Sequence, residues 1–154
     1  MKSILFIFLC GIFLSLSCGN SRQLNEQKIQ QGLEGIVQIV KGDRMPSPDV
    51  PLAEPAGYPT TVYIHELTAV SQLRKLNKAG LYANVPTTLV ASVKTDSLGH
   101  FAVELPPGEY SVFVQYENGF YANWFNEKNQ IGPTLVQEKK LTRLKLLVSA
   151  DATF

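Results

Sequence analysis

The chain contains two histidines, His65 and His100, and His65 is followed directly by the carboxylate Glu66. A zinc hydrolase needs two imidazoles and a carboxylate that converge on the metal. Neighbouring side chains on a strand point to opposite faces, so His65 and Glu66 cannot share one ion. We therefore predict no metal site, and we expect His100 to be solvated on the polar side of its strand.

Other catalytic patterns are also missing from the sequence. It has neither a Gly-x-Ser-x-Gly elbow for a nucleophilic serine nor a glycine-rich loop for phosphate. Its acidic residues are scattered singly, so a converging carboxylate pair of the glycosidase type could arise only through the fold. We expect no enzymatic activity, no catalytic residue and no cofactor.

An aromatic segment is the strongest candidate for an interaction site. Five aromatic residues fall within ten positions and are mixed with asparagines: Tyr116, Phe120, Tyr121, Trp124 and Phe125, with Asn118, Asn123 and Asn126. Flat apolar rings beside amide groups suit the recognition of a protein or a sugar. Tyr121, Trp124 and Phe125 are the predicted contacts. The alternative is that Phe120, Trp124 and Phe125 close one end of the hydrophobic core.

The first residues have the three-part pattern of an export signal. Lys2 supplies a positive charge, residues 4–14 are almost entirely apolar, and residues 15–17 are small or apolar. The apolar run is shorter than the roughly 20 residues that a membrane-spanning helix needs. Residues 1–17 are therefore predicted to be a helical signal peptide rather than a transmembrane segment.

Residues 14–18 (LSLSC) resemble the lipobox of bacterial lipoproteins, although Ser15 occupies the place where leucine is usual. The resemblance implies cleavage before Cys18 and diacylglycerol on its thiol, so that a lipid anchor is the membrane partner. An ordinary signal with an incidental cysteine is the alternative.

Residues 18–31 are polar and form the predicted tether. Because no acidic run follows Cys18, we expect the periplasmic face of the outer membrane in the cell envelope.

Charge and composition narrow the possible partners. The formal net charge is +1, and removal of residues 1–17 leaves equal numbers of basic and acidic residues. Nucleic-acid binding depends on neutralising phosphates with basic residues, so no nucleic-acid partner is expected. Hydrophobic residues make up 45% of the chain, which is enough for a folded core.

The remaining chain has the period-two alternation of half-buried strands. Turn residues separate the strands at 96–99, 106–108 and 118–119, and residues 69–79 could form a turn or two of helix. Residues 45–59 hold five of the nine prolines and are expected to be an extended surface loop that could meet a partner. Strands are predicted at residues 33–39, 61–67, 89–94, 101–105, 110–116, 134–137 and 144–148, with a short one at 151–154.

Residues 95–112 (TDSLGHFAVELPPGEYSV) resemble the carboxypeptidase regulatory-like domain family, and residues 32–37 are similar to its first strand. The likeness covers residues 32–154 and, in combination with residues 42–46 and 120–125, looks like lipoproteins of the Bacteroidetes type. It implies a single transthyretin-like (prealbumin-like) antiparallel β-sandwich of about seven strands, with Phe101 and Tyr110 pointing inward from neighbouring strands. The family supplies no catalytic residues.

These observations lead to a non-catalytic, lipid-anchored envelope protein whose domain at 32–154 binds or scaffolds an unknown envelope protein or glycan. The alternative is a carbohydrate-binding accessory protein of a polysaccharide-utilisation system. A hydrolase similar to the transthyretin-fold enzymes that act on a small cyclic urea is a third hypothesis. The clustered histidines that such an enzyme needs are not present in the sequence.

Overall fold

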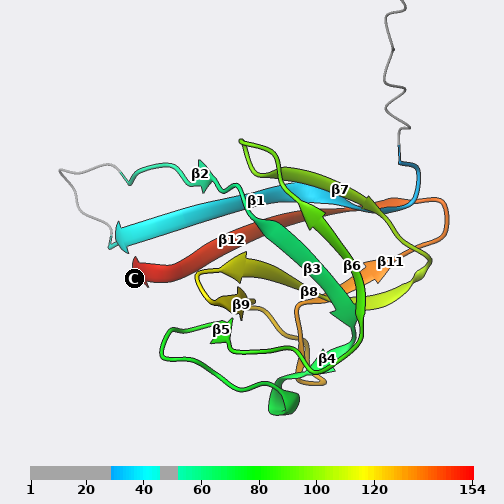
Figure 1. The fold of residues 1–154 in the computed structure, drawn as a ribbon. Coiled ribbons are helices and arrows are strands. Elements are labelled where there is room, and N and C mark those ends of the chain that lie inside the picture. The colour runs from blue at the N-terminus through cyan, green and yellow to red at the C-terminus, as the bar shows by residue number, and fades with distance from the viewer. Residues whose placement is uncertain (1–28, 46–51) are drawn as a thin grey trace, which may run out of the picture.

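The computed structural model describes residues 29–45 and 52–154. The predicted signal peptide, Cys18, most of the tether and part of the proline-rich loop lie outside these residues. The described part is built from strands with one short 3₁₀ turn, η1 (Val70–Gln72), and it forms two packed sheets and a separate two-stranded ribbon of residues 68–69 with 130–131 (Figure 1). None of its helices has the length and apolar character needed to cross a bilayer. The predicted all-β sandwich is confirmed.

The structure contains more strands than the sequence predicts, because several are only two or three residues long. In chain order they are β1 (Gly32–Asp43), β2 (Ala56–Gly57), β3 (Thr61–Glu66), β4 (Thr68–Ala69), β5 (Leu81–Tyr82), β6 (Leu89–Lys94), β7 (His100–Glu104), β8 (Gly108–Tyr116), β9 (Gly119–Tyr121), β10 (Gln130–Ile131), β11 (Pro133–Val136) and β12 (Leu141–Thr153).

The smaller sheet is centred on β1. On one side β1 pairs with β12 in parallel, from Gly32 opposite Leu141 to Asp43 opposite Thr153. On its other side it pairs antiparallel with β7 and then with β2. The parallel pair is an exception to the antiparallel sandwich that the sequence predicts. It joins the first and last long strands of the domain, a pairing that no turn signal can reveal.

The larger sheet has the order β5-β9-β8-β3-β6, and β11 also pairs with β8. Residues Tyr110 to Val114 of β8 are all buried, so this strand is covered on both faces. One face meets the smaller sheet. The other is covered by a second apolar cluster that includes Tyr82, Phe113 and Ile131.

The main core lies between the two sheets. Leu33 and Val37 of β1 face inward together with Val112 and Val114 of β8, and all four have at most 1% of their surface exposed. Burial of side chains of this size stabilises a fold by about 1.5–3 kcal/mol each. Phe101 and Tyr110 also point into this core, as predicted, but they come from facing sheets rather than from neighbouring strands.

The turn at residues 96–99 is present but does not form a hairpin within one sheet. It leads from β6 in the larger sheet to β7 in the smaller one, and residues 105–107 lead back to β8. One carboxylate oxygen of Asp96, Oδ1, accepts hydrogen bonds from the backbone N–H of Leu98 (2.9 Å) and of His100 (2.8 Å). By contrast, Glu117 and Asn118 do join paired strands, β8 and β9.

Two further expectations need correction. Within residues 69–79 the only helical turn is the 3₁₀ turn η1, and the chain after it is irregular apart from a β-bridge of Lys75 with Tyr82. Residues 151–153 are not a separate strand, because they continue β12 beyond a bulge where Ser149 and Ala150 lie opposite Val40. A bulge of this kind reverses the alternation, which is why the sequence shows a break there.

Substitution of Gly99 tests how closely the turn at residues 96–99 approaches the smaller sheet. Its φ is +87°, and a Cβ added there would overlap the carbonyl oxygen of Val37. Gly42 has a similar φ of +74° but has no atom within 4 Å of that position. Gly42→Ala should therefore cost only the left-handed backbone strain, about 1–2 kcal/mol. We expect Gly99→Ala to lower the free energy of unfolding by more than Gly42→Ala.

Urea denaturation of the two variants and the wild type measures this difference. Equal losses for Gly99→Ala and Gly42→Ala would show that the turn does not press against β1.

Candidate functional site

The three predicted contact residues have different environments. Tyr121 has only 2% of its surface exposed, and its hydroxyl lies 3.0 Å from Ser149 Oγ and accepts a hydrogen bond from the Ser149 N–H. Trp124 is half-buried and packs against both apolar clusters. Phe125 is 66% exposed. Tyr121 is therefore part of the core, and Phe125 is the one of the three whose ring faces solvent.

A groove of about 430 Å³ lies beside Phe125. Residues 75–80 line one side of it, and Asn123 and Phe125 line the other. Buried Tyr82, Ala122 and Ile131 complete the lining. The groove thus combines an apolar base with exposed amide, ammonium and aromatic groups, which is the usual make-up of a ligand site.

Backbone pairing fixes both walls of the groove. On one side, Lys75 and Tyr82 form a β-bridge, and Gly80, with a φ of +72°, accepts a hydrogen bond from the Ala122 N–H at 2.9 Å. On the other side, Phe125 forms a bridge with Ile131. The groove is therefore formed before any ligand arrives, which lowers the entropic cost of binding.

A polar cluster attaches the first wall to the rest of the sandwich. Lys78 Nζ lies 2.5 Å from Glu117 Oε1 and 2.6 Å from Asp151 Oδ1. Asp151 also accepts a hydrogen bond from the Tyr116 hydroxyl. The same Nζ is 5.7 Å from the centre of the Tyr116 ring. These contacts tie the groove loop to the β8–β9 hairpin and to the end of β12.

The pKa values of these groups shift as their contacts require. Hydrogen bonds to Asp151 and then to Glu117 raise the pKa of Lys78. The hydrogen bond from Lys78, followed by that from Tyr116, lowers the pKa of Asp151 below its ordinary 3.8. Burial, followed by the hydrogen bond to Asp151, raises the pKa of Tyr116 to about 12. Lys78 and Asp151 are therefore charged, and Tyr116 neutral, near neutral pH.

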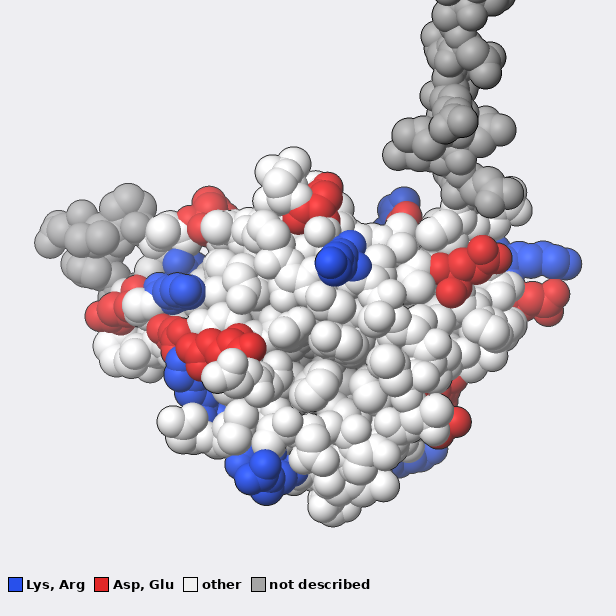
Figure 2. Space-filling model, in the orientation of Figure 1, with Lys and Arg blue, Asp and Glu red and all other residues white. Residues whose placement is uncertain are grey.

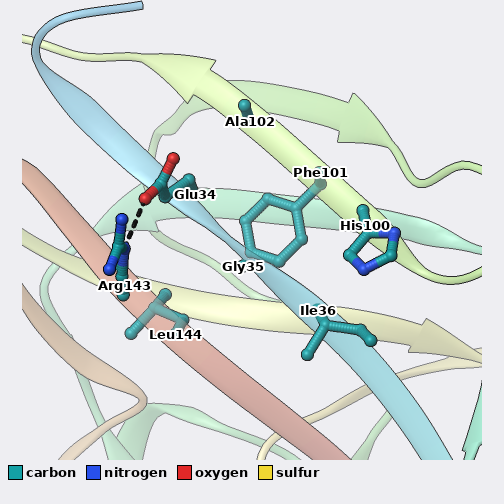
Figure 3. A pocket seen from close by; sticks show the side chains of 8 residues that line it. All are labelled: Glu34, Gly35, Ile36, His100, Phe101, Ala102, Arg143 and Leu144. Carbon is teal, nitrogen blue, oxygen red and sulfur yellow. Dashed lines mark hydrogen bonds and ion pairs between the residues drawn. The ribbon is translucent and has the colours of Figure 1, made fainter.

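A second hollow, of about 380 Å³, lies on the smaller sheet (Figure 3). At one end, Arg143 Nε of β12 is 2.6 Å from Glu34 Oε1 of β1, and at the other end lies His100 of β7. Ile36 and Ala102 contribute apolar surface between them. An exposed ion pair of this kind contributes little to stability, and the hollow offers one imidazole and no nucleophile.

The histidines lie apart. His65 is 6% exposed, and its Nδ1 lies 2.9 Å from the carbonyl oxygen of Thr87, which fixes the hydrogen on Nδ1. Its Nε2 has no hydrogen-bond partner, and the ring packs edge-on against Phe113. Glu66 is exposed and His100 is solvated, as expected. Within residues 29–45 and 52–154, no three potential metal ligands cluster.

The described part of the proline-rich loop lies along β1. β2 pairs with β1 there, and Arg44 Nη1 and Gln38 Nε2 donate hydrogen bonds to the carbonyl oxygens of Ala53 and Pro55. Residues 46–51 lie outside the described chain, so the predicted partner contact of this loop is not placed.

Comparison with family models, curated proteins and solved structures finds no match to this chain. The carboxypeptidase regulatory-like resemblance therefore remains a prediction from the residues that carry it.

Replacement of Asp151 tests the polar cluster. Because the pKa of Asp151 is lowered in the fold, its contribution is present above pH 3.8 and is lost as the pH falls through the folded pKa. Asp151→Asn should therefore unfold at lower urea concentration than the wild type near neutral pH, and the gap should narrow in acid. The control is Glu127→Gln, an exposed carboxyl with no ion pair among the described residues.

Urea midpoints across the acid range measure this effect. If the difference in urea midpoint between Asp151→Asn and the wild type were the same at all pH values, the ion pair of Asp151 with Lys78 would be contradicted.

Proposed function

We propose that this chain is a non-catalytic, lipid-anchored protein of the cell envelope whose carboxypeptidase regulatory-like β-sandwich binds a partner at the groove beside Phe125. The anchor is the acylated Cys18, and residues 19–31 are the tether. The proposed location is the periplasmic face of the outer membrane. The partner is an envelope protein or a glycan.

The observation that carries this proposal is the position of the groove relative to the start of the domain. The described chain enters β1 at one end of the molecule, whereas β4, β5 and β9 lie at the opposite side (Figure 1). Gln31 fixes the entry point, because its Nε2 donates to the Leu105 carbonyl and its Oε1 accepts from the Lys139 N–H. A lipid on Cys18 would thus be attached through the entry end of the sandwich, and the groove lies on the side far from that attachment.

The length of the tether is compatible with this arrangement. The thirteen residues between Cys18 and Gly32 reach about 45 Å when extended, at roughly 3.5 Å per residue.

The face of the domain seen in Figure 2 carries charges of both signs around a largely uncharged centre. Such a surface favours contact through shape and hydrogen bonding over electrostatic attraction to one sign of charge.

The second candidate is a carbohydrate-binding accessory protein of a polysaccharide-utilisation system. The specific observation in its favour is the 66% exposure of Phe125 at the edge of a groove that also presents Asn77 and Asn123. The flat apolar face of an aromatic ring can pack against a sugar ring, while neighbouring amide groups bond its hydroxyls.

Replacement of Cys18 tests the anchor. Cells that express the full chain with radiolabelled palmitate should label the wild type and Cys10→Ser but not Cys18→Ser, because only the thiol after the cleavage point is acylated. The label should follow the membrane fraction. Cys10→Ser is the matched control, since the other cysteine lies within the predicted signal.

Globomycin, which blocks cleavage of lipoprotein precursors, should cause the larger precursor to accumulate. Unchanged labelling of Cys18→Ser, or the absence of label on the wild type, would overturn the proposed lipid anchor.

A further inference from the structure

We propose that the groove between residues 75–80 and Phe125 binds a short segment of a neutral saccharide. This inference rests on the proposed binding function and specifies its ligand. Phe125 supplies a flat apolar face for the ring, and Asn77, Asn123 and the Tyr82 hydroxyl supply hydrogen bonds for its hydroxyl groups.

Tyr82 adds a hydroxyl group to the lining of the groove. The residue lines the groove, although only 5% of its surface is exposed. Its pKa is raised by burial and by the nearby Tyr121, with no hydrogen bond from any described residue contributing. This hydroxyl is not among the fully buried polar atoms that lack a partner, so it is open to a new hydrogen bond, and a sugar hydroxyl in the groove could take the place of water there.

The edges of the groove carry groups suited to sugar hydroxyls. Asn77 and Asn123 are exposed and line the groove from two different chain segments. An amide side chain both donates and accepts, as a sugar hydroxyl does, so one amide can bond two adjacent hydroxyls. Phe125 is held in place by the bridge to Ile131 and by the closed turn in which the Asn126 N–H donates to the Gln130 carbonyl at 3.1 Å.

Charge balance favours a neutral saccharide over an acidic one. Two ammonium groups, those of Lys75 and Lys78, line the groove. The charge on Lys78 is already opposed by both Glu117 and Asp151. The two positive charges of the lysines and the two negative charges of these carboxylates cancel formally. The site therefore has no net positive charge with which to select a uronate or a sulfated sugar.

The size of the groove suits a small ligand. Its volume of about 430 Å³ lies in the lower part of the range of roughly 300–1,000 Å³ that is typical of small-molecule sites. The hollow on the smaller sheet is similar in size, but it presents the Glu34–Arg143 ion pair and apolar side chains. The groove beside Phe125 is therefore the better saccharide site.

Calorimetric titration of the full-length protein, purified in detergent, tests this inference. The probes are gluco-, manno- and galacto-oligosaccharides as neutral ligands and oligogalacturonate as the acidic one. Phe125→Ala and Tyr82→Phe should each weaken the binding of a neutral oligosaccharide by about tenfold. Phe154→Ala should leave it unchanged, because Phe154 is equally exposed (73%) but does not line the groove.

Three results would overturn the inference. The first is that none of the neutral oligosaccharides binds. The second is binding that Phe125→Ala and Tyr82→Phe leave unaffected, which would place the site elsewhere. The third is binding of oligogalacturonate alone, weakened by salt, which would show that the site selects negative charge.

The folded state of each variant is checked by its urea midpoint, which should match the wild type because Phe125 is exposed and Tyr82→Phe removes one oxygen.

Palmitate labelling of the wild type distinguishes a failure of the proposed lipid anchor from a failure of the proposed saccharide ligand. A labelled protein that binds no neutral saccharide retains its anchor and loses only the assigned ligand. If a photo-crosslinker at position 123 then captures a protein at that site, the saccharide assignment is contradicted.

Discussion

The parallel pairing of β1 with β12 is the constraint on which the candidate site depends. It aligns the first long strand of the domain with the last along almost their whole length. The bulge at Ser149 and Ala150 then turns Ser149 toward Tyr121 and Asp151 toward Tyr116 and Lys78. The end of the chain thereby holds the loop that forms one wall of the groove. If this pairing slipped by one residue, Asp151 would point to the other face, and Lys78 would lose one of its two carboxylates.

The groove and the point where the described chain enters β1 lie at opposite sides of the domain (Figure 1), and this arrangement gives the proposed function its geometry. Binding at this groove needs no moving part, because both walls of the groove are fixed by backbone hydrogen bonds. Preformed sites bind without an ordering cost, so modest contacts are enough for useful affinity. The carboxylates of Glu117 and Asp151 hold Lys78 in place and thereby make the groove loop more rigid. They also oppose the positive charge of Lys78, so the same contacts affect both the stability of the loop and the charge that a ligand would meet.

Much of the fold was predictable from the sequence, because strands with one buried face alternate in hydrophobicity. The ranges at 89–94 and 110–116 coincide with β6 and lie within β8. Two features were not predictable. Phe113 stands on the outward face of β8 and is nevertheless buried, because the irregular segments around Tyr82 and Ile131 cover it. Residues 96–99 predict a reversal, but a turn does not reveal whether the next strand joins the same sheet or the facing one. The site was predictable only in part. The aromatic run pointed to Phe125, whereas tertiary pairing brings Lys78 and Tyr82 to the groove and Asp151 to Lys78.

Hydrogen exchange of the full-length protein in lipid vesicles, with and without a neutral oligosaccharide, tests the central claim most directly. It reports which backbone segments a ligand covers while the anchor is in the membrane. The account predicts slower exchange in residues 75–82 and 121–126 on addition of the sugar, with residues 29–36 and 104–108 unchanged. Slower exchange confined to residues 29–36, 100–108 or 141–145 would contradict it, because the ligand would then lie at the entry end of the chain or on the smaller sheet.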